Sequence, residues 1–150
     1  MPHSYISCHI HYVFSTKYRV NIISDEIKER LWAYMGGIAR ENKLTLLSIG
    51  GTSDHIHILL NIPSTITIAK AIQLIKGGSS KWVNDTFQAL QKFSWQEGYG
   101  AFSVSVSGIK DTITYTQTQE EHHKKLTFQE EYIAFLKKHG IDYDERYIWD

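Results

Sequence analysis

The sequence contains very little cysteine and proline. Cys8 is the only cysteine among 150 residues, and only two residues are proline, one of them at position 2. A single thiol excludes a disulfide within the chain and a zinc site built from several thiolates, so any metal site must use nitrogen and oxygen ligands. No proline-rich or low-complexity stretch marks a linker. We therefore expect a single domain over residues 1–150.

Long apolar runs and an excess of one charge are also missing. No stretch approaches the roughly 20 apolar residues that span a bilayer. The start, Met1 to Ser4, lacks the basic and apolar regions of a signal peptide, so we expect a cytoplasmic protein without membrane contact. Lysine and arginine together number 16, as do aspartate and glutamate. This balance argues against a uniformly basic protein that coats DNA, but it leaves room for a local basic groove.

Hydrophobic periodicity predicts four strands and four helices. The strands cover residues 5–15, 43–49, 54–61 and 101–107, and the helices cover residues 24–42, 67–87, 111–123 and 127–140. The first six elements follow the order β-α-β-β-α-β, which is typical of a ferredoxin-like antiparallel sheet in the α+β class. We expect helices on one face of this sheet and an open side, left for a partner, that carries the polar half of each strand.

Two histidines lie two residues apart in the third predicted strand. Successive strand residues alternate between faces, so His55 and His57 share one face while Ile56 points to the other. Neighbouring imidazoles on a polar face make half of a metal site. A second such pair, His9 and His11, lies in the first strand. Either pair is also compatible with ordinary hydrogen-bonded histidines.

A tyrosine and a glutamine follow on one predicted helix. Tyr115 and Gln119 are four residues apart and therefore lie on the same helix face. A phenol is almost wholly protonated at neutral pH, so it becomes a useful nucleophile only when its proton is removed and its target is made electrophilic. A divalent ion bound to a phosphodiester does the latter, and the Gln119 carbonyl is a candidate ligand for it. Alternatively, Tyr115 packs on the sheet and Gln119 is solvated.

These residues resemble the HUH single-tyrosine transposases of bacterial insertion sequences, and most closely the REP-associated tyrosine transposases. The resemblance extends over nearly the whole chain. Its blocks are Asp54-His55-Ile56-His57-Ile58-Leu59-Leu60, Tyr115-x-x-x-Gln119, Phe14-Ser15-Thr16-Lys17-Tyr18-Arg19, Lys76-Gly77-Gly78-Ser79-Ser80, Trp95-Gln96-Glu97-Gly98-Tyr99-Gly100-Ala101-Phe102-Ser103 and Gln119-Glu120-Glu121-His122-His123-Lys124. One departure is Gly78, where the family has a basic residue, so one phosphate contact is not expected here.

The resemblance implies a DNA transposase that cleaves and rejoins single-stranded DNA next to hairpins through a 5′-phosphotyrosine. Tyr115 would be the nucleophile. His55, His57 and Gln119 would bind Mg²⁺ or Mn²⁺. The resemblance also implies a homodimer, in which the tyrosine helix of one subunit is able to serve the histidine pair of the other.

Five basic residues are candidate DNA contacts, each of which is equally a solvated surface charge: Lys17, Arg19, Lys76, Lys81 and Lys110. We expect His9 and His11 to support the pair His55 and His57 or to face DNA.

Two other functions fit the same residues. Ferredoxin-like sheets also bind single strands without catalysis, so a non-catalytic single-stranded nucleic-acid-binding module is the main alternative. A metal-dependent hydrolase, with water as the nucleophile and Tyr115 in a structural role, is a third.

Overall fold

The computed structural model describes residues 4–87 and 92–149. The strands are β1 (His9–Ser15), β2 (Thr45–Gly51), β3 (His55–Asn61) and β4 (Gly100–Val104). The helices are α1 (Asp25–Glu41), α2 (Ile68–Thr86), α3 (Ile109–Gln117), α4 (Gln119–His122) and α5 (Phe128–Lys138), with short 3-10 turns η1 (Lys17–Arg19) and η3 (Val106–Gly108). Among the described residues, no helix is both long enough and apolar enough to cross a membrane.

The four strands form one antiparallel sheet in the order β2-β3-β1-β4. This is the ferredoxin-like arrangement, so the predicted fold class is confirmed. The central strands β1 and β3 pair so that Val13 lies opposite His57, and His11 lies opposite Leu59 on one side and Phe102 on the other. Because β1 and β3 are neighbours, the two predicted histidine pairs lie on adjacent strands.

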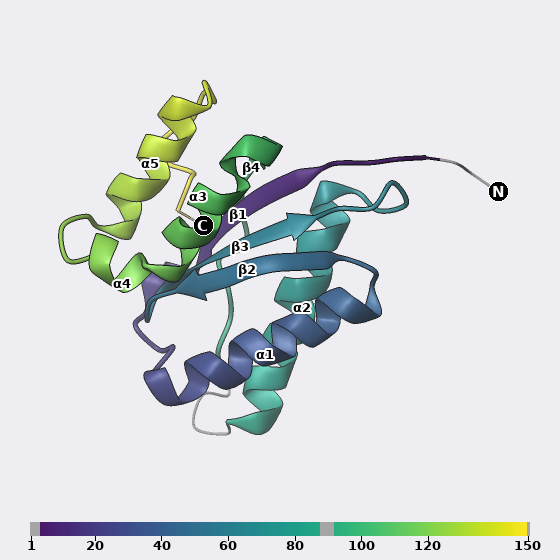
Figure 1. The fold of residues 1–150 in the computed structure, drawn as a ribbon. Helices are drawn as coiled ribbons and strands as arrows, with labels where there is room; N and C mark the ends of the chain where they lie inside the picture. Colours follow the sequence, from purple (N-terminus) through teal and green to yellow (C-terminus); the bar gives the residue numbers. More distant parts are fainter. Residues whose placement is uncertain (1–3, 88–91, 150) are drawn as a thin grey trace.

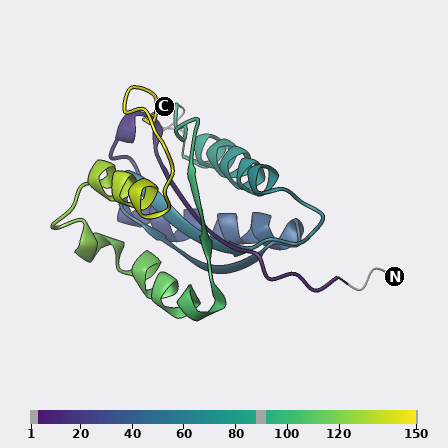
Figure 2. The ribbon, with the colours of Figure 1, turned by 90° about the horizontal axis from the view of Figure 1, so that it is seen from above.

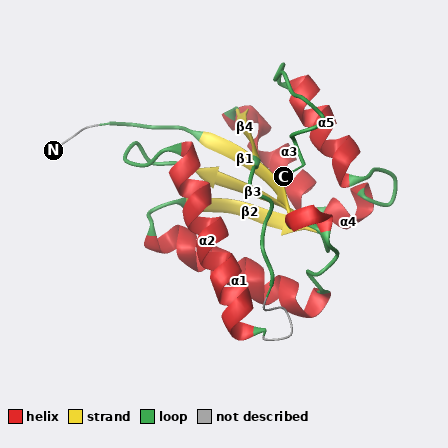
Figure 3. Cartoon of the chain, turned by 180° about the vertical axis from the view of Figure 1, so that it is seen from behind, coloured by secondary structure: helices red, strands yellow, loops and turns green. Residues whose placement is uncertain are grey.

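Helices α1 and α2 cover one face of the sheet (Figures 1 and 3). Both begin at a hydroxyl N-cap: Ser24 accepts from the backbone N–H of Ile27, and Thr67 accepts from that of Lys70. The main core lies between these helices and the inward side chains of the central strands. Those strand residues are Ile10, Tyr12, Phe14, Ile56, Ile58 and Leu60.

The second face of the sheet differs from the expected open side, because α3 and α5 lie over it (Figures 1 and 2). Helix α5 begins at the predicted capping box of Thr127 and Glu130. Its apolar side chains pack against Val13 and Phe102 in a second, smaller core. The physical reason is that this face carries apolar residues among its polar ones, and covering them removes apolar surface from water.

Several boundaries also differ from the predicted ones. Strand β1 begins at His9 rather than at residue 5, because its partners β3 and β4 end at Asn61 and Val104. The helix predicted over residues 111–123 is divided into α3 and α4 at Thr118, whose hydroxyl donates to the Thr114 carbonyl. Such back-bonding by a threonine competes with regular helix geometry.

Candidate metal and nucleophile site

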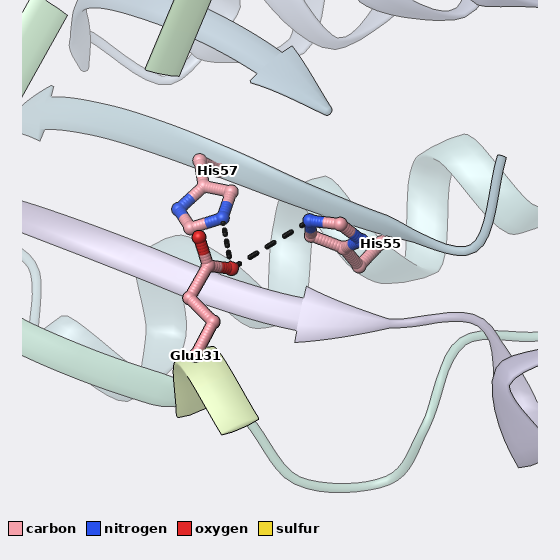
Figure 4. Close-up of side chains that lie close together, drawn as sticks. All are labelled: His55, His57 and Glu131. Carbon is pink, nitrogen blue, oxygen red and sulfur yellow. Dashed lines mark hydrogen bonds and ion pairs between the residues drawn. The ribbon is translucent and has the colours of Figure 1, made fainter. Parts of the chain in front are cut away.

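His55 and His57 lie on the same face of β3, as the strand pattern predicts, but both are completely buried. Between them lies the carboxylate of Glu131, which comes from α5 (Figure 4). Glu131 Oε1 is 2.9 Å from His57 Nε2 and 3.6 Å from His55 Nε2. These three side chains offer ligand atoms within 4.8 Å of one another.

The orientation of His55 is set by two neighbours. Its Nδ1 lies 2.7 Å from Asp54 Oδ1 and 2.9 Å from Thr52 Oγ1. Burial favours protonation of Asp54, but the hydrogen bond and charge of His55 outweigh it and lower the pKa of that carboxyl below its usual value. Since an ionised carboxylate only accepts, Nδ1 carries the imidazole proton. Nε2 of the same ring lies 3.1 Å from Gln119 Oε1 and 3.6 Å from Glu131 Oε1.

His57 is held by a third histidine. His57 Nδ1 is 2.7 Å from His11 Nε2. Burial first, and then the charge of His57, lower the pKa of His11 to about 3, so His11 is neutral and can donate a hydrogen bond through Nε2. With the Nε2–H of His11 donating to His57 Nδ1, the Nε2–H of His57 donates to Glu131 at 2.9 Å. His11 therefore supports the pair His55 and His57, whereas His9 lies at the protein surface near Ser7.

Glu131 was missed by sequence analysis, although a signal was present. It is an acidic residue within the apolar stripe of α5, three residues after Phe128 and next to Tyr132. Burial would raise the pKa of Glu131, but the neighbouring imidazoles of His123 and His57 outweigh burial and hold that pKa well below its usual value. An ionised carboxylate therefore stands among the histidines.

Tyr115 reaches this carboxylate and His57, and Gln119 reaches His55. The Tyr115 hydroxyl donates to Glu131 Oε2, and its ring meets the His57 ring edge-on at 5.5 Å. Gln119 Nε2 donates to the Tyr115 carbonyl at 3.0 Å, which turns the Gln119 carbonyl oxygen toward His55. Burial first, and then the hydrogen bond and charge of Glu131, raise the pKa of Tyr115 above its ordinary value. The phenol is therefore protonated.

The donor set fits a divalent cation. Gln119 Oε1 and Glu131 Oε1 lie 3.1 and 3.6 Å from His55 Nε2, so two oxygen atoms face the same ring nitrogen. His123 Nε2 is buried 3.2 Å from Glu131 Oε1 and has no aligned hydrogen-bond partner among the described residues. Imidazole, carboxylate and amide ligands without thiolate suit Mn²⁺ or Mg²⁺ better than soft metals.

The predicted DNA contacts are mostly engaged within the chain. Lys17 and Lys81 form ion pairs with carboxylates at 3.7 and 2.7 Å. The Arg19 guanidinium lies 5.4 Å from the centre of an aromatic ring. Lys110 is exposed in the first turn of α3.

Lys76 differs most from the expectation. Its ammonium donates to three carbonyl oxygens, those of Gln96, Glu97 and Gly98, at 2.7, 3.2 and 2.8 Å. All three of its donors are used in this way, so Lys76 fixes the loop before β4. A phosphate contact by Lys76 stays a prediction and would require it to release one of these carbonyls. Sequence alone does not show which carbonyls converge on a lysine, so this contact with the loop could not be predicted from the motif.

Comparison with known proteins places this geometry in a family. Residues 4–119 match the family model described as "Transposase IS200 like". The transposase for insertion sequence element IS200 of Salmonella typhimurium is 25% identical over 135 residues, which cover 85% of this chain and 88% of the relative. The ISDra2 transposase TnpA of Deinococcus radiodurans is 25% identical over 116 residues, covering 74% of this chain and 83% of the relative.

Solved structures share the fold. A candidate transposase of Deinococcus radiodurans R1 superposes with a TM-score of 0.65 at 24% identity, covering 78% of this chain and 97% of that one. A REP-associated tyrosine transposase bound to a REP hairpin superposes with a TM-score of 0.61 at 12% identity, covering 82% and 73%. The family model matches all four strands, helices α1 to α3 and Gln119. The chain therefore belongs to the IS200-like transposase family.

Proposed function

We propose that this protein cleaves and rejoins single-stranded DNA next to hairpins through a 5′-phosphotyrosine intermediate on Tyr115. His55, His57 and Gln119 would hold Mg²⁺ or Mn²⁺. The observation that carries the proposal is the position of Tyr115. The Tyr115 hydroxyl is hydrogen bonded to the Glu131 carboxylate, which also contacts His57, and the chain belongs to a transposase family.

The proposed reaction exchanges one phosphoester for another. Tyr115 Oη forms a bond to phosphorus while the bond from phosphorus to the 3′ oxygen breaks. The phenol loses one proton and the departing 3′ oxygen gains one. Because the phosphotyrosine conserves the energy of the broken phosphodiester, a free 3′-hydroxyl can reverse the step without ATP.

Residues around the donors prepare them for this role. Asp54 fixes the tautomer of His55, His11 orients His57, and the Tyr115 carbonyl orients Gln119. When bound, the divalent ion would polarise the phosphodiester and stabilise the charge on the departing oxygen. Hydrogen-bonded supporting residues of this kind commonly contribute 10- to 100-fold in metal affinity or activity.

Two cavities beside Tyr115 support an unpaired strand as substrate. Each has a volume of about 210 Å³, and Tyr115, Phe135 and Lys138 line both. Neither is large enough for a duplex. The ammonium of Lys138 suits a phosphate, and the ring of Phe135 suits a base, which is the usual combination in single-strand binding. We therefore add Lys138 to the proposed DNA contacts.

The hairpin and the homodimer are further parts of the proposal. A hairpin is supported by the relative that was solved with a REP hairpin. The homodimer rests on the family resemblance, and sedimentation of the purified protein tests it. Within the chain described here, Tyr115 reaches its own histidine pair.

A covalent adduct assay tests the chemistry. The protein is incubated with a labelled hairpin that carries single-stranded flanks and with Mn²⁺, and protein–DNA adducts are separated under denaturing conditions. We expect an adduct with wild type and none with Tyr115→Phe, which should still bind the hairpin. Intact hairpin binding without an adduct on any hairpin would overturn the proposal in favour of a binding module. Cleaved ends without attached protein would instead indicate hydrolysis by water.

A further inference from the structure

Helix α5 lies beyond the residues that match the family model, which end at 119, yet it contributes to the centre of the site. Its residue Glu131 is only 1% exposed. Burying an ionised carboxylate is unfavourable unless charges or hydrogen bonds compensate for lost water. The contacts of Glu131 therefore indicate what the carboxylate is for.

The two carboxylate oxygens have separate partners. Oε1 faces ring nitrogens of three histidines: His57 at 2.9 Å, His123 at 3.2 Å and His55 at 3.6 Å. Oε2 accepts the hydroxyl of Tyr115. One side chain thus joins the nitrogen ligands to the proposed nucleophile, and Figure 4 shows its carboxylate directed between the two β3 histidines.

We propose that Glu131 is an additional ligand of the divalent ion and the positioning residue that holds the Tyr115 hydroxyl beside it. This inference rests on the proposed function, because it concerns the same metal site and the same nucleophile. It adds an anionic ligand to the two histidines and the neutral Gln119.

The alternative role for Glu131 is that of a counter-charge for a protonated histidine. The position of Gln119 favours the ligand role. Its carbonyl oxygen lies 3.1 Å from His55 Nε2, and Glu131 Oε1 lies 3.6 Å from the same nitrogen. A counter-charge for a histidine needs no second oxygen beside that nitrogen, whereas a divalent ion binds several such donors at once.

A negatively charged ligand also suits the ions in question. Mg²⁺ and Mn²⁺ prefer oxygen ligands, and Mg²⁺ sites in proteins commonly include one or two carboxylates. Two imidazoles and an amide alone would be a weak set for such ions. Glu131 supplies the missing carboxylate from a helix whose packing on Val13 and Phe102 fixes its position.

Mn²⁺ binding by the whole chain tests the ligand role without relying on catalysis. Free Mn²⁺ is followed by electron paramagnetic resonance during titration of wild type, Glu131→Gln, Glu130→Gln and His57→Ala. Glu130 is the matched control, because it is exposed on the same helix and glutamine preserves a capping box. We expect Glu131→Gln to lower Mn²⁺ affinity by roughly 10- to 100-fold and Glu130→Gln to leave it unchanged.

The outcomes separate this inference from the proposed function. If His57→Ala weakens Mn²⁺ binding and Glu131→Gln does not, the ligand role of Glu131 is wrong and the histidine site stands. If neither variant weakens it, the metal site of the proposed function is wrong as well. Urea unfolding of each variant shows whether a lost signal reflects a lost fold, and the isosteric glutamine keeps that risk small.

The positioning role has its own spectroscopic readout. A tyrosine hydroxyl bonded to a buried carboxylate gives a downfield proton resonance that exchanges slowly with water, and Tyr115→Phe identifies it. We expect this resonance in wild type and in Glu130→Gln, and its loss in Glu131→Ala. A resonance that persists unchanged in folded Glu131→Ala would show that another group holds Tyr115 and would overturn the positioning role.

Discussion

The contact between β2 and α3 makes a sharp prediction about Gly50. This glycine pairs with His57 across the sheet, and a Cβ added to it would lie 1.8 Å from the Thr116 carbonyl oxygen. Non-bonded carbon and oxygen atoms stay roughly 3.3 Å apart. In Gly50→Ala, α3 would therefore have to retreat from β2 by about 1.5 Å. The backbone atoms involved cannot rotate away as a side chain would.

Two effects of Gly50→Ala follow from that displacement. Overpacking should lower the free energy of unfolding by about 1–3 kcal/mol. Because Tyr115 precedes the displaced carbonyl directly, its hydroxyl should move by about 1 Å or more, which reduces the rate of adduct formation roughly 100-fold. Urea unfolding measures the first effect, and time courses of adduct formation with the labelled hairpin and Mn²⁺ measure the second.

Gly77→Ala is the matched control. A Cβ at Gly77 would meet no atom within 4 Å, and the residue lies inside α2. Alanine there should stabilise the protein by roughly 0.5–1 kcal/mol and leave adduct formation unchanged. Wild-type stability and a wild-type adduct rate in Gly50→Ala would refute the idea that close packing of α3 on β2 positions Tyr115.

Three further predictions address pH, capping and DNA contact. Because the folded-state pKa of His11 is about 3 against 6.5 when unfolded, only the unfolded chain gains this proton near pH 5, so stability falls as pH falls. Between pH 8 and 5, urea unfolding should show wild type losing about 2 kcal/mol more than a folded His11→Gln variant; equal losses would contradict a buried neutral His11. Thr127→Ala removes the α5 capping box and should lower the free energy of unfolding by about 1 kcal/mol, with Thr127→Ser close to wild type in the same assay. Lys138→Ala should reduce the slope of log hairpin affinity against log salt by about 0.7, as for one lost phosphate contact on a single strand, whereas Lys137→Ala, which lines neither cavity beside Tyr115, should leave the slope unchanged.

Strand geometry explains why much of the sheet was predictable. Side chains alternate strictly along a strand, so a run such as His55-Ile56-His57 assigns its own faces. The structure places Ile56 in the main core and both histidines on the opposite face. Helix starts at Ser24 and Thr127 were equally readable, because a hydroxyl cap is a local signal.

The covered second face was less readable for a physical reason. Whether a helix packs on a mixed face depends on contacts between residues far apart in sequence, such as Val13 and Phe102 with α5. Local periodicity carries no information about such pairings. For the same reason Glu131 looked like one charge among others on its helix, although it lies on the stripe that contacts the histidines.

The helix that carries the candidate nucleophile was partly predicted. Four-residue spacing brought Tyr115 and Gln119 to one side, and the side chain of Gln119 does bond to the Tyr115 carbonyl. The interruption at Thr118 was not anticipated, because threonine is tolerated inside many helices. That interruption makes Gln119 the first residue of α4, and its carbonyl oxygen lies beside His55.

The position of α5 bears on how shortened forms of the protein would behave. A fragment limited to the family-matched residues 4–119 would keep the sheet and both helices of the main core, but it would uncover Phe102 and the histidine pair. Such a fragment would also lack Glu131, so we expect it to bind Mn²⁺ more weakly than the whole chain.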